Sequence, residues 1–317
     1  MTTTLGRSEH SGGAAAQVRR RTPAGPPPSS LISAANALRL AALLSPLAAG
    51  FASACSHPCP LGLVATEQGR VSDPDLAEAS GLVWGGAGAW WTHNDDGDPS
   101  MYVLNDDGDV TAIVELGAVD PVDIEDVAMR WEGGQPVELL VGDIGGESGD
   151  RESIAVYRLD PTSPTTGTVD VGFEIWTYPD GEDRDAEALL IDPTDGRPYV
   201  VTQEKDGGGR LLRAGATPKV ETVLEDLGTL AAIGSTPITA GDVSPDGAWV
   251  ALRSRDQVWL WERAEGQTLD VVLAGEPCVS TLTEEPQGES IAFDSNGFVT
   301  LSEGVNQPLL RYEWPVR

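Results

Sequence analysis

The sequence contains very little lysine and histidine, and both shortages exclude classes of function. Only two of its 317 residues are Lys and three are His, whereas 50 are Asp or Glu, which gives a formal net charge of −30. Binding to phosphate backbones or anionic lipid requires clustered Lys and Arg, so we expect no nucleic-acid partner and no contact with a charged membrane surface. The acidic side chains could bind divalent cations. In the plainer interpretation, they form a solvated surface that keeps the protein soluble.

Long hydrophobic runs are also missing. The uncharged stretch at residues 40–51 is too short to span a bilayer, which takes about 20 apolar residues. It follows three arginines and precedes A-S-A-C ending at Cys55, the order of an export signal. The small-small-Cys ending resembles a bacterial lipoprotein signal with Cys55 lipidated. We therefore expect residues 1–54 to be an export segment, 55–62 a tether and 63–317 one domain, located in the cell envelope or secreted and touching a membrane only through lipid.

Cysteine is scarce, with only Cys55, Cys59 and Cys278. If Cys55 carries lipid, an oxidising compartment could join Cys59 to Cys278. In the chain-entropy treatment, a bridge over so long a loop is worth up to about 5 kcal/mol. A local bridge between Cys55 and Cys59 is an alternative. A zinc site is disfavoured because the chain has no second Cys/His cluster.

One pattern occurs five times: a small or acidic residue, a short apolar strand, a Gly-containing turn and a second strand. The copies begin 45 to 62 residues apart, at Ser80, Glu125, Glu187, Gly241 and Glu289. A third apolar run follows each copy, and a fourth run follows the first four, at residues 110–116, 169–178, 220–227 and 269–273. Four-stranded units of this length are typical of propeller blades.

The fifth copy lacks its fourth run, which residues 63–71 could supply. We therefore expect an all-β, five-bladed β-propeller of four-stranded blades that is closed by an N-terminal strand. A six-bladed ring, with an extra blade between Asp143 and Asp185, is the alternative.

The string N-D-D-G-D occurs twice, at residues 94–98 and 105–109. The second copy lies between the third and fourth runs, where a hairpin must reverse, and Asp-Gly is a preferred pair for such a turn. The first copy ends a second strand, so Asp95, Asp96 and Asp98 could be rim residues or metal ligands. Neither copy fits the twelve-residue EF-hand frame.

Polar residues recur where first strands begin and second strands end, and these points meet at one mouth of a propeller channel. Oxygen ligands suit Ca²⁺, so the sequence predicts a Ca²⁺ site there. The alternative is a polar lining of a water-filled channel. The candidate ligands are Asn94, Glu125, Asp126, Asp143, Glu187, Glu204, Asp242, Glu289 and Glu303.

Catalytic residues are harder to find. His93 could act as a general base with Ser80 or Ser290 as nucleophile, but a lone histidine at a strand end more often forms a structural hydrogen bond. Several of the nine Trp residues occupy equivalent strand positions and are expected in the core between blades, with sugar stacking as the alternative; they are Trp90, Trp249, Trp259 and Trp261.

Together these motifs resemble those of uncharacterised secreted bacterial β-propeller proteins, with the pattern EASGL, THNDxGD, VGDIG, DAEALL, DxSPDG and GExIA. The segments that carry them here are residues 78–82, 92–98, 141–146, 185–193, 241–247 and 288–292. Gly146-Glu147 replaces the usual Asp-Asn, and Gly241 replaces an Ala. More distantly, the chain is similar to gluconolactonase-like and phytase-like propellers, which implies Ca²⁺ held by acids and Asn at the channel mouth.

Two functions follow as expectations. The first is a monomeric propeller that binds a protein or small-molecule ligand on its disk face. The second is a Ca²⁺-dependent hydrolase of a lactone or phosphoester. The phosphoester version lacks lysine for a phosphate clamp and would depend on arginines near the loops. These are Arg151, Arg184, Arg253 and Arg255.

Overall fold

The computed structural model describes Cys59 and residues 62–95, 97–146, 151–204, 208–217 and 219–313. The chain divides into two units, Met1–Ala52 and Ser53–Arg317. The first unit and Cys55 lie outside the described residues. The predicted export segment and lipidation site therefore also lie outside them. Among the described residues, no helix is long and apolar enough to cross a membrane.

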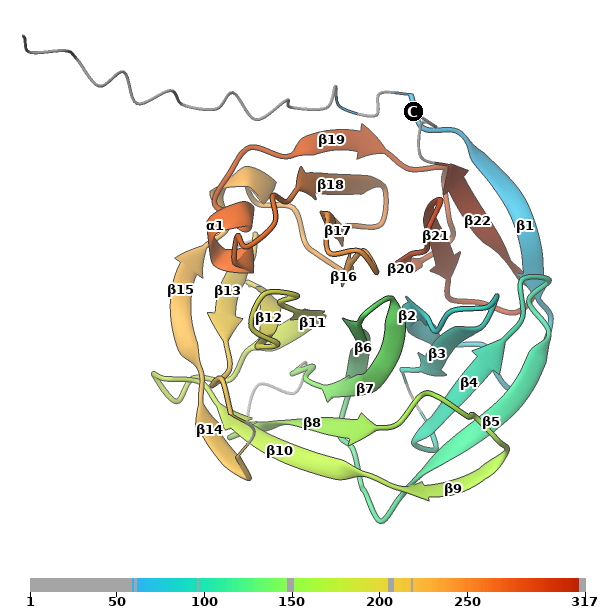
Figure 1. Cartoon of the computed structure of the whole chain (residues 1–317), viewed down its shortest axis with the longest axis horizontal. Helices are drawn as coiled ribbons and strands as arrows, with labels where there is room; N and C mark the ends of the chain where they lie inside the picture. The colour runs from blue at the N-terminus through green and yellow to red at the C-terminus, as the bar shows by residue number, and fades with distance from the viewer. Residues whose placement is uncertain are drawn as a thin grey trace, which may run out of the picture. The chain divides into compact units, whose positions relative to one another are not determined.

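Within the second unit, the described strands form five sheets arranged as blades around a ring (Figure 1), and we number the blades 1 to 5 in the chain order of their innermost strands. The innermost strands are β2 (Ala79–Trp84), β6 (Ile124–Glu132), β11 (Asp185–Ile191), β16 (Ala240–Val243) and β20 (Gly288–Phe293). The second strands are β3 (Trp90–Asn94), β7 (Gln135–Asp143), β12 (Pro198–Gln203), β17 (Trp249–Arg253) and β21 (Gly297–Ser302). The third strands are β4 (Ser100–Leu104), β8 (Ile154–Leu159), β13 (Arg210–Arg213), β18 (Gln257–Glu262) and β22 (Gln307–Glu313). The predicted five-bladed propeller is confirmed, and the six-bladed alternative is wrong.

The ring closes as the sequence predicts. Strand β1 (Ala65–Val71) pairs antiparallel with β22 and so becomes the outermost strand of blade 5. The predicted disulfide between Cys59 and Cys278 is confirmed, with Cα atoms 5.2 Å apart across a separation of 219 residues. It attaches the segment before β1 to β19 (Cys278–Thr281), the outermost strand of blade 4. Strand pairing and a covalent bond therefore both hold the start of the domain.

The predicted fourth runs at residues 169–178 and 220–227 each form two strands that belong to neighbouring blades. The remaining fourth strands are β5 (Val110–Gly117) in blade 1, β10 (Gly172–Thr177) in blade 2 and β15 (Glu225–Thr229) in blade 3. Strand β9 (Gly167–Asp170) pairs in parallel with β5, and β14 (Glu221–Val223) pairs in parallel with β10. The chain thus adds a fifth strand to blades 1 and 2 before it continues into the next sheet.

The predicted strand at residues 269–273 is wrong, because these residues form helix α1 (Leu269–Leu273). Its buried side chains are Leu269, Val272 and Leu273, which follow the helical spacing rather than the alternation of a strand. The Oδ2 atom of Asp192 accepts a hydrogen bond from the Leu269 amide at 2.8 Å and so satisfies one free amide at the start of the helix. Strand β19 supplies the fourth strand of blade 4 instead.

Two smaller predictions are also confirmed. Trp90, Trp259 and Trp261 are at most 3% exposed and pack in the core, whereas Trp249 is half-buried and packs against the core. Residues 105–109 form a turn in which the Gly108 amide donates to the Asn105 carbonyl at 3.0 Å. Gly108 has a φ of 87°, a left-handed conformation that glycine adopts without strain.

Candidate metal centre

The three glutamates at strand starts reach the channel because each lies in a β-bulge. The pairing of innermost and second strands skips Glu125 in blade 2, Glu187 in blade 3 and Glu289 in blade 5. A bulged residue leaves the regular ladder, and bulges often re-aim a side chain beside a functional site. In blade 1 the same place is taken by Ser80 and Gly81, whereas the described pairing of β16 in blade 4 is regular.

These bulges border a cavity of about 490 Å³ at one mouth of the channel, which we call the acidic cavity. Its described lining holds eight carboxyl groups: Asp95, Asp123, Glu125, Asp185, Glu187, Asp256, Glu289 and Glu303. Arg255 is the one cationic residue in that lining, and its side chain is 64% exposed. The cavity therefore has far more negative than positive side chains.

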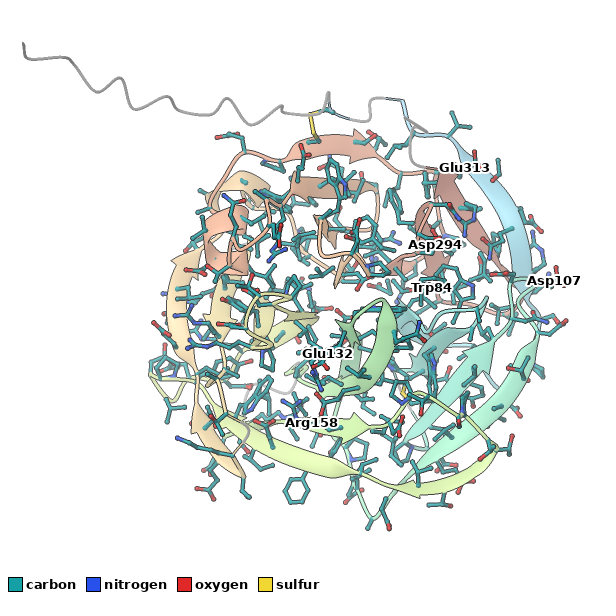
Figure 2. The ribbon with its side chains drawn as sticks, in the orientation of Figure 1. Trp84, Asp107, Glu132, Arg158, Asp294 and Glu313 are labelled. Carbon is teal, nitrogen blue, oxygen red and sulfur yellow. A yellow bond between two sulfur atoms is a disulfide. The ribbon has the colours of Figure 1, made fainter. Side chains whose placement is uncertain are left out.

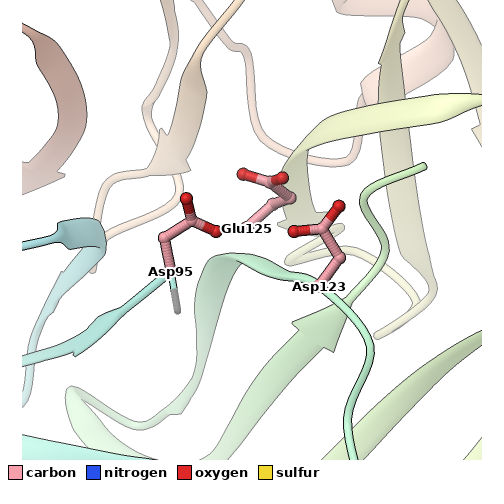
Figure 3. Close-up of side chains that lie close together, drawn as sticks. All are labelled: Asp95, Asp123 and Glu125. Atoms are coloured by element: carbon pink, nitrogen blue, oxygen red, sulfur yellow. The ribbon is translucent and has the colours of Figure 1, made fainter. Parts of the chain in front are cut away.

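Five of these carboxylates form two overlapping groups. In each group, one carboxylate oxygen per residue lies within 4.8 Å of the others. The first group is Asp95, Asp123 and Glu125, whose side chains are directed toward one another (Figure 3). The second is Glu125, Asp185 and Glu187. Glu125 belongs to both, so it is the centre of the cluster.

The loop after β7 leaves room for this cluster because it contains glycine. A Cβ atom on Gly145 would lie 2.3 Å from Asp123 Oδ2 and 2.5 Å from Glu125 Oε1, far inside normal contact. The next residue contributes directly, since the Gly146 amide donates to Asp185 Oδ1 at 3.0 Å. The sequence V-G-D-I-G-G is therefore the end of β7 followed by a short loop, Ile144-Gly145-Gly146, that packs against the carboxylates.

Burial and mutual repulsion raise the pKa values of these acids. Burial is the largest cause for Glu125, and the neighbouring charges of Glu187 and Asp123 add to it, which raises the pKa to about 11. Burial and the charge of Asp185 raise the pKa of Glu187 to about 9. Burial and the charge of Glu289 raise the pKa of Glu303 to about 7. Close carboxylates in such a site must hold protons or a cation.

The structure brings four of the nine predicted ligands to this cavity and places five elsewhere. The four are Glu125, Glu187, Glu289 and Glu303. The described lining does not include Asn94, Asp126, Asp143, Glu204 or Asp242.

Asp126 and Asp242 satisfy backbone amides in the middle of the channel. Asp126 is 0% exposed, and its Oδ2 accepts hydrogen bonds from the amides of Leu189 at 2.8 Å and Gly241 at 3.4 Å. Asp242 Oδ2 accepts from the Phe293 amide at 2.7 Å. Innermost strands are edge strands, so their inward amides need partners of this kind. Burial raises the pKa of Asp242 to about 8 and that of Asp126 well above its usual range.

Asp143 is outside the described lining of the cavity and binds the backbone next to it. Its Oδ1 accepts hydrogen bonds from the amides of Val122 at 3.1 Å and Asp123 at 3.0 Å, and it forms an ion pair with Arg151 at 2.5 Å. The hydroxyl of Tyr157 donates to Oδ2 at 3.0 Å. Asp143 therefore positions the segment that carries Asp123.

The other two predicted ligands have structural partners as well. Arg184 donates to Glu204 Oε1 at 3.1 Å. The amide group of Asn94 donates to the Asp75 carbonyl at 2.7 Å and accepts from the Glu78 amide at 3.1 Å.

The sequence interpretation missed Asp123 and Asp185, both of which lie in the cluster. Each stands two residues before a bulged glutamate, in the strings D-I-E and D-A-E. This D-x-E repeat in neighbouring blades was a usable signal, because residues two apart on a strand share a face. The bulge is the part of the geometry that the spacing does not reveal.

His93 is 1% exposed and is absent from the described lining of the acidic cavity. Its Nδ1 lies 3.0 Å from the Asn94 carbonyl and must donate to it, which leaves Nε2 unprotonated. Nε2 has no hydrogen-bond partner among the described residues. Burial lowers the pKa of His93 to about 4.

No protein-family model matches the chain, and no curated protein matches it. Many solved structures are similar to it, including the following three. An aldose sugar dehydrogenase from Streptomyces coelicolor, in its PQQ-bound form, has a TM-score of 0.47 and 10% identity, over 80% of this chain and 99% of that one. A candidate gluconolactonase has a TM-score of 0.45 and 15% identity, over 79% and 92%. The allergen Mala s 1 from Malassezia sympodialis has a TM-score of 0.48 and 10% identity, over 78% and 96%. At these identities and TM-scores, the likeness carries no conclusion about the activity of this chain.

Proposed function

We propose that the acidic cavity binds Ca²⁺ and that the cation-loaded mouth is the ligand-binding face of an exported propeller. The main support is the position of Glu125, which belongs to both three-carboxylate groups. The described lining of this cavity contains a single cationic side chain, that of Arg255. A divalent cation would relieve the repulsion that raises the pKa values of Glu125 and Glu187.

The donor set fits a hard cation. Ca²⁺ takes about 6–8 oxygen ligands and tolerates irregular geometry, whereas Mg²⁺ demands a strict octahedron. Zinc and copper prefer imidazole nitrogen and sulfur ligands, and the described lining of the acidic cavity contains no His, Cys or Met. The residues that would hold the ion are Asp95, Asp123, Glu125, Asp185 and Glu187. Bound there, Ca²⁺ would supply a Lewis acid for an oxygen of the ligand.

Arg255 supports a second candidate, hydrolysis of a lactone. Its exposed guanidinium lines the cavity beside Glu289, with which it pairs only loosely at 3.5 Å, so it could contact a ligand oxygen. A phosphoester is less well served, because the other three candidate arginines are already paired. Arg151 binds Asp143, Arg184 binds Asp180 and Glu204, and Arg253 binds Glu285. Binding, without catalysis, is the function that these contacts support best.

Export and a lipid anchor at Cys55 complete the proposal. The disulfide between Cys59 and Cys278 supports export, because disulfides persist in oxidising compartments. The partner would be a protein or a small molecule rather than nucleic acid, and we propose that the protein is a monomer.

The test is thermal unfolding of the purified protein in EDTA and then in excess Ca²⁺. At about 100 times its dissociation constant the ion should add about 2.7 kcal/mol. For a domain of this size, this corresponds to a rise in Tm of about 5–10 °C. Glu125→Gln should remove the rise. Asp256→Asn is the matched control, since Asp256 lines the same cavity but belongs to neither group. If the wild-type protein shows no rise, or shows the same rise with NaCl alone, the proposal is wrong.

A further inference from the structure

The innermost strands border a second, larger cavity where they end. It has a volume of about 770 Å³ and lies among the turns that follow β6, β11 and β16. We call it the aromatic cavity because Trp84 and Trp131 line it. The buried carboxyl group of Asp126, hydrogen-bonded across the channel to Leu189 and Gly241, lies between the two ends. The aromatic cavity is therefore a feature separate from the acidic one.

Its tryptophans differ from those of the core. Trp84 is the last residue of β2, and Trp131 lies near the end of β6; their rings stack with centroids 5.4 Å apart and planes at 24°. Both residues are half-buried, whereas Trp90 is 0% exposed. Figure 2 shows Trp84 and Glu132 toward the centre of the ring and Asp107 at its rim. A large aromatic surface left partly open inside a cavity indicates a site for a ligand.

Three of the charged side chains that line this cavity already form ion pairs: Arg130, Glu132 and Asp195. Arg130 forms ion pairs with Glu132 and Glu138, and Asp195 pairs with Arg197 at 3.1 Å. Such paired groups favour a neutral ligand over a cation, because a cation would have to compete with the existing arginines.

Other lining groups offer short polar contacts. Asp246 Oδ1 accepts a hydrogen bond from the Ser244 hydroxyl at 2.6 Å, which leaves Oδ2 for a donor. The Thr194 hydroxyl is already engaged, because it donates to the Gln267 carbonyl at 3.0 Å and accepts from the Arg263 guanidinium. Asp192 is fully buried and is engaged by the amides of Thr194 and Leu269, so it supports the turn and not the ligand.

We propose that the aromatic cavity is a binding site for a neutral saccharide. A pyranose ring presents an apolar C–H face that can pack on Trp84 and Trp131, and a rim of hydroxyls that both donate and accept. Asp246 and Glu132 accept from such hydroxyls, and Arg130 donates to them. The volume lies within the range of pockets that enclose small organic ligands, roughly 300–1,000 Å³.

The test is calorimetric titration of the whole protein with four neutral tetrasaccharides: cellotetraose, xylotetraose, maltotetraose and chitotetraose. At least one should bind with a dissociation constant on the order of 1 mM or tighter. Its affinity should be equal in EDTA and in Ca²⁺, which separates this site from the acidic cavity. Trp84→Ala and Trp131→Ala should each weaken binding about tenfold. Phe173→Ala is the control, because Phe173 is an exposed aromatic outside the described lining of both cavities.

Three outcomes would overturn the proposal. One is the absence of heat with all four sugars at about 10 mM. Another is binding that survives in both Trp variants. The third is tighter binding of tetramethylammonium than of any sugar, which would assign the cavity to cations. If either alanine variant does not fold, Trp131→Phe keeps the packing and should still reduce the affinity.

Discussion

The cavities at the two ends of the innermost strands differ in their side chains, although the same five strands border both. One is lined mainly by carboxylates, and the other contains two tryptophans. Where the strands begin, bulges turn Glu125, Glu187 and Glu289 out of the ladder and into the acidic cavity. Where they end, tight turns and two stacked tryptophans enclose the aromatic cavity. Between the two ends, Asp126 and Asp242 use their carboxyl groups on backbone amides. The comparison teaches that acid content alone does not define a site: the backbone around each acid decides whether it faces a ligand or the protein.

The largest effect is expected from separate substitutions of the neighbours Glu125 and Asp126. Asp126→Ala removes the acceptor for the amides of Val127, Leu189 and Gly241, and it should lower the free energy of unfolding by about 3–5 kcal/mol. Glu125→Gln should change it by less than about 1 kcal/mol at neutral pH in EDTA, because Glu125 is already protonated there. Urea unfolding of both variants measures the difference. Equal losses would mean that Glu125 is as structural as Asp126.

The pH dependence of stability should differ between the metal-free and the Ca²⁺-loaded protein. Folding raises the pKa of Glu187 from 4.5 to about 9 and that of Glu303 from 4.5 to about 7. A group with a raised pKa stabilises the folded state fully below its unfolded pKa, and this contribution is lost as the pH rises through the folded pKa.

In EDTA, the Tm should therefore fall as the pH rises from about 5 to about 9. In Ca²⁺ the ion replaces the protons, so the fall should be smaller and the two curves should diverge with pH. Curves that stay parallel would contradict a cation at the carboxylate cluster. Thermal melts at matched ionic strength measure both.

Gly145 offers a smaller change that acts on the acidic cavity alone. In Gly145→Ala the new methyl group would displace the carboxylates of Asp123 and Glu125, so Ca²⁺ affinity should fall about 10–100-fold. Gly172→Ala is the control, because its new Cβ would meet nothing closer than Arg158 Cβ at 3.9 Å. Calorimetric titration with Ca²⁺ measures both variants. Unchanged affinity in Gly145→Ala would place the ion away from Asp123 and Glu125.

The sequence predicted the parts of this molecule that depend on local pattern. Strand repeats and turns gave the five blades, and the missing last run gave the closing strand β1. The position of Glu at three strand starts accounts for three of the four predicted ligands that line the acidic cavity. The pattern could not reveal the bulges, since these depend on the register between two strands. It also could not show that Asp126 points at backbone amides while Glu125, one residue earlier, faces the cavity.

Other errors have equally local causes. The apolar run 269–273 has the composition of a strand, but its spacing is helical and Asp192 binds its first amide. Asp123 and Asp185 were missed because each precedes the apolar run that marked the repeat. The predicted ligand Asp143 lies beside the cavity, but Arg151 and Tyr157, 8 and 14 residues further along the chain, occupy its carboxylate.

The two N-D-D-G-D strings allow the finest comparison, because they share a sequence but differ in backbone setting. In the second string, Asn105 Oδ1 accepts from the amides of Asp107 at 3.0 Å and Asp109 at 2.9 Å, so Asn105→Ala should lower the free energy of unfolding by about 1 kcal/mol. In the first string, Asp95 lies in the carboxylate group with Asp123 and Glu125. Asp95→Asn should therefore weaken Ca²⁺ binding and leave metal-free stability within about 0.5 kcal/mol.

Ca²⁺ titration and urea unfolding of both variants should show a crossed result, with stability lost in one and affinity in the other. If Asn105→Ala also weakens Ca²⁺ binding, the turn at the outer edge of blade 1 influences the channel mouth. If Asp95→Asn leaves the affinity unchanged, the ion is held by Glu125, Asp185 and Glu187 without the first string. The Ca²⁺ affinity of Asp95→Asn therefore shows which of the two overlapping groups holds the ion, because Asp95 belongs to only one of them.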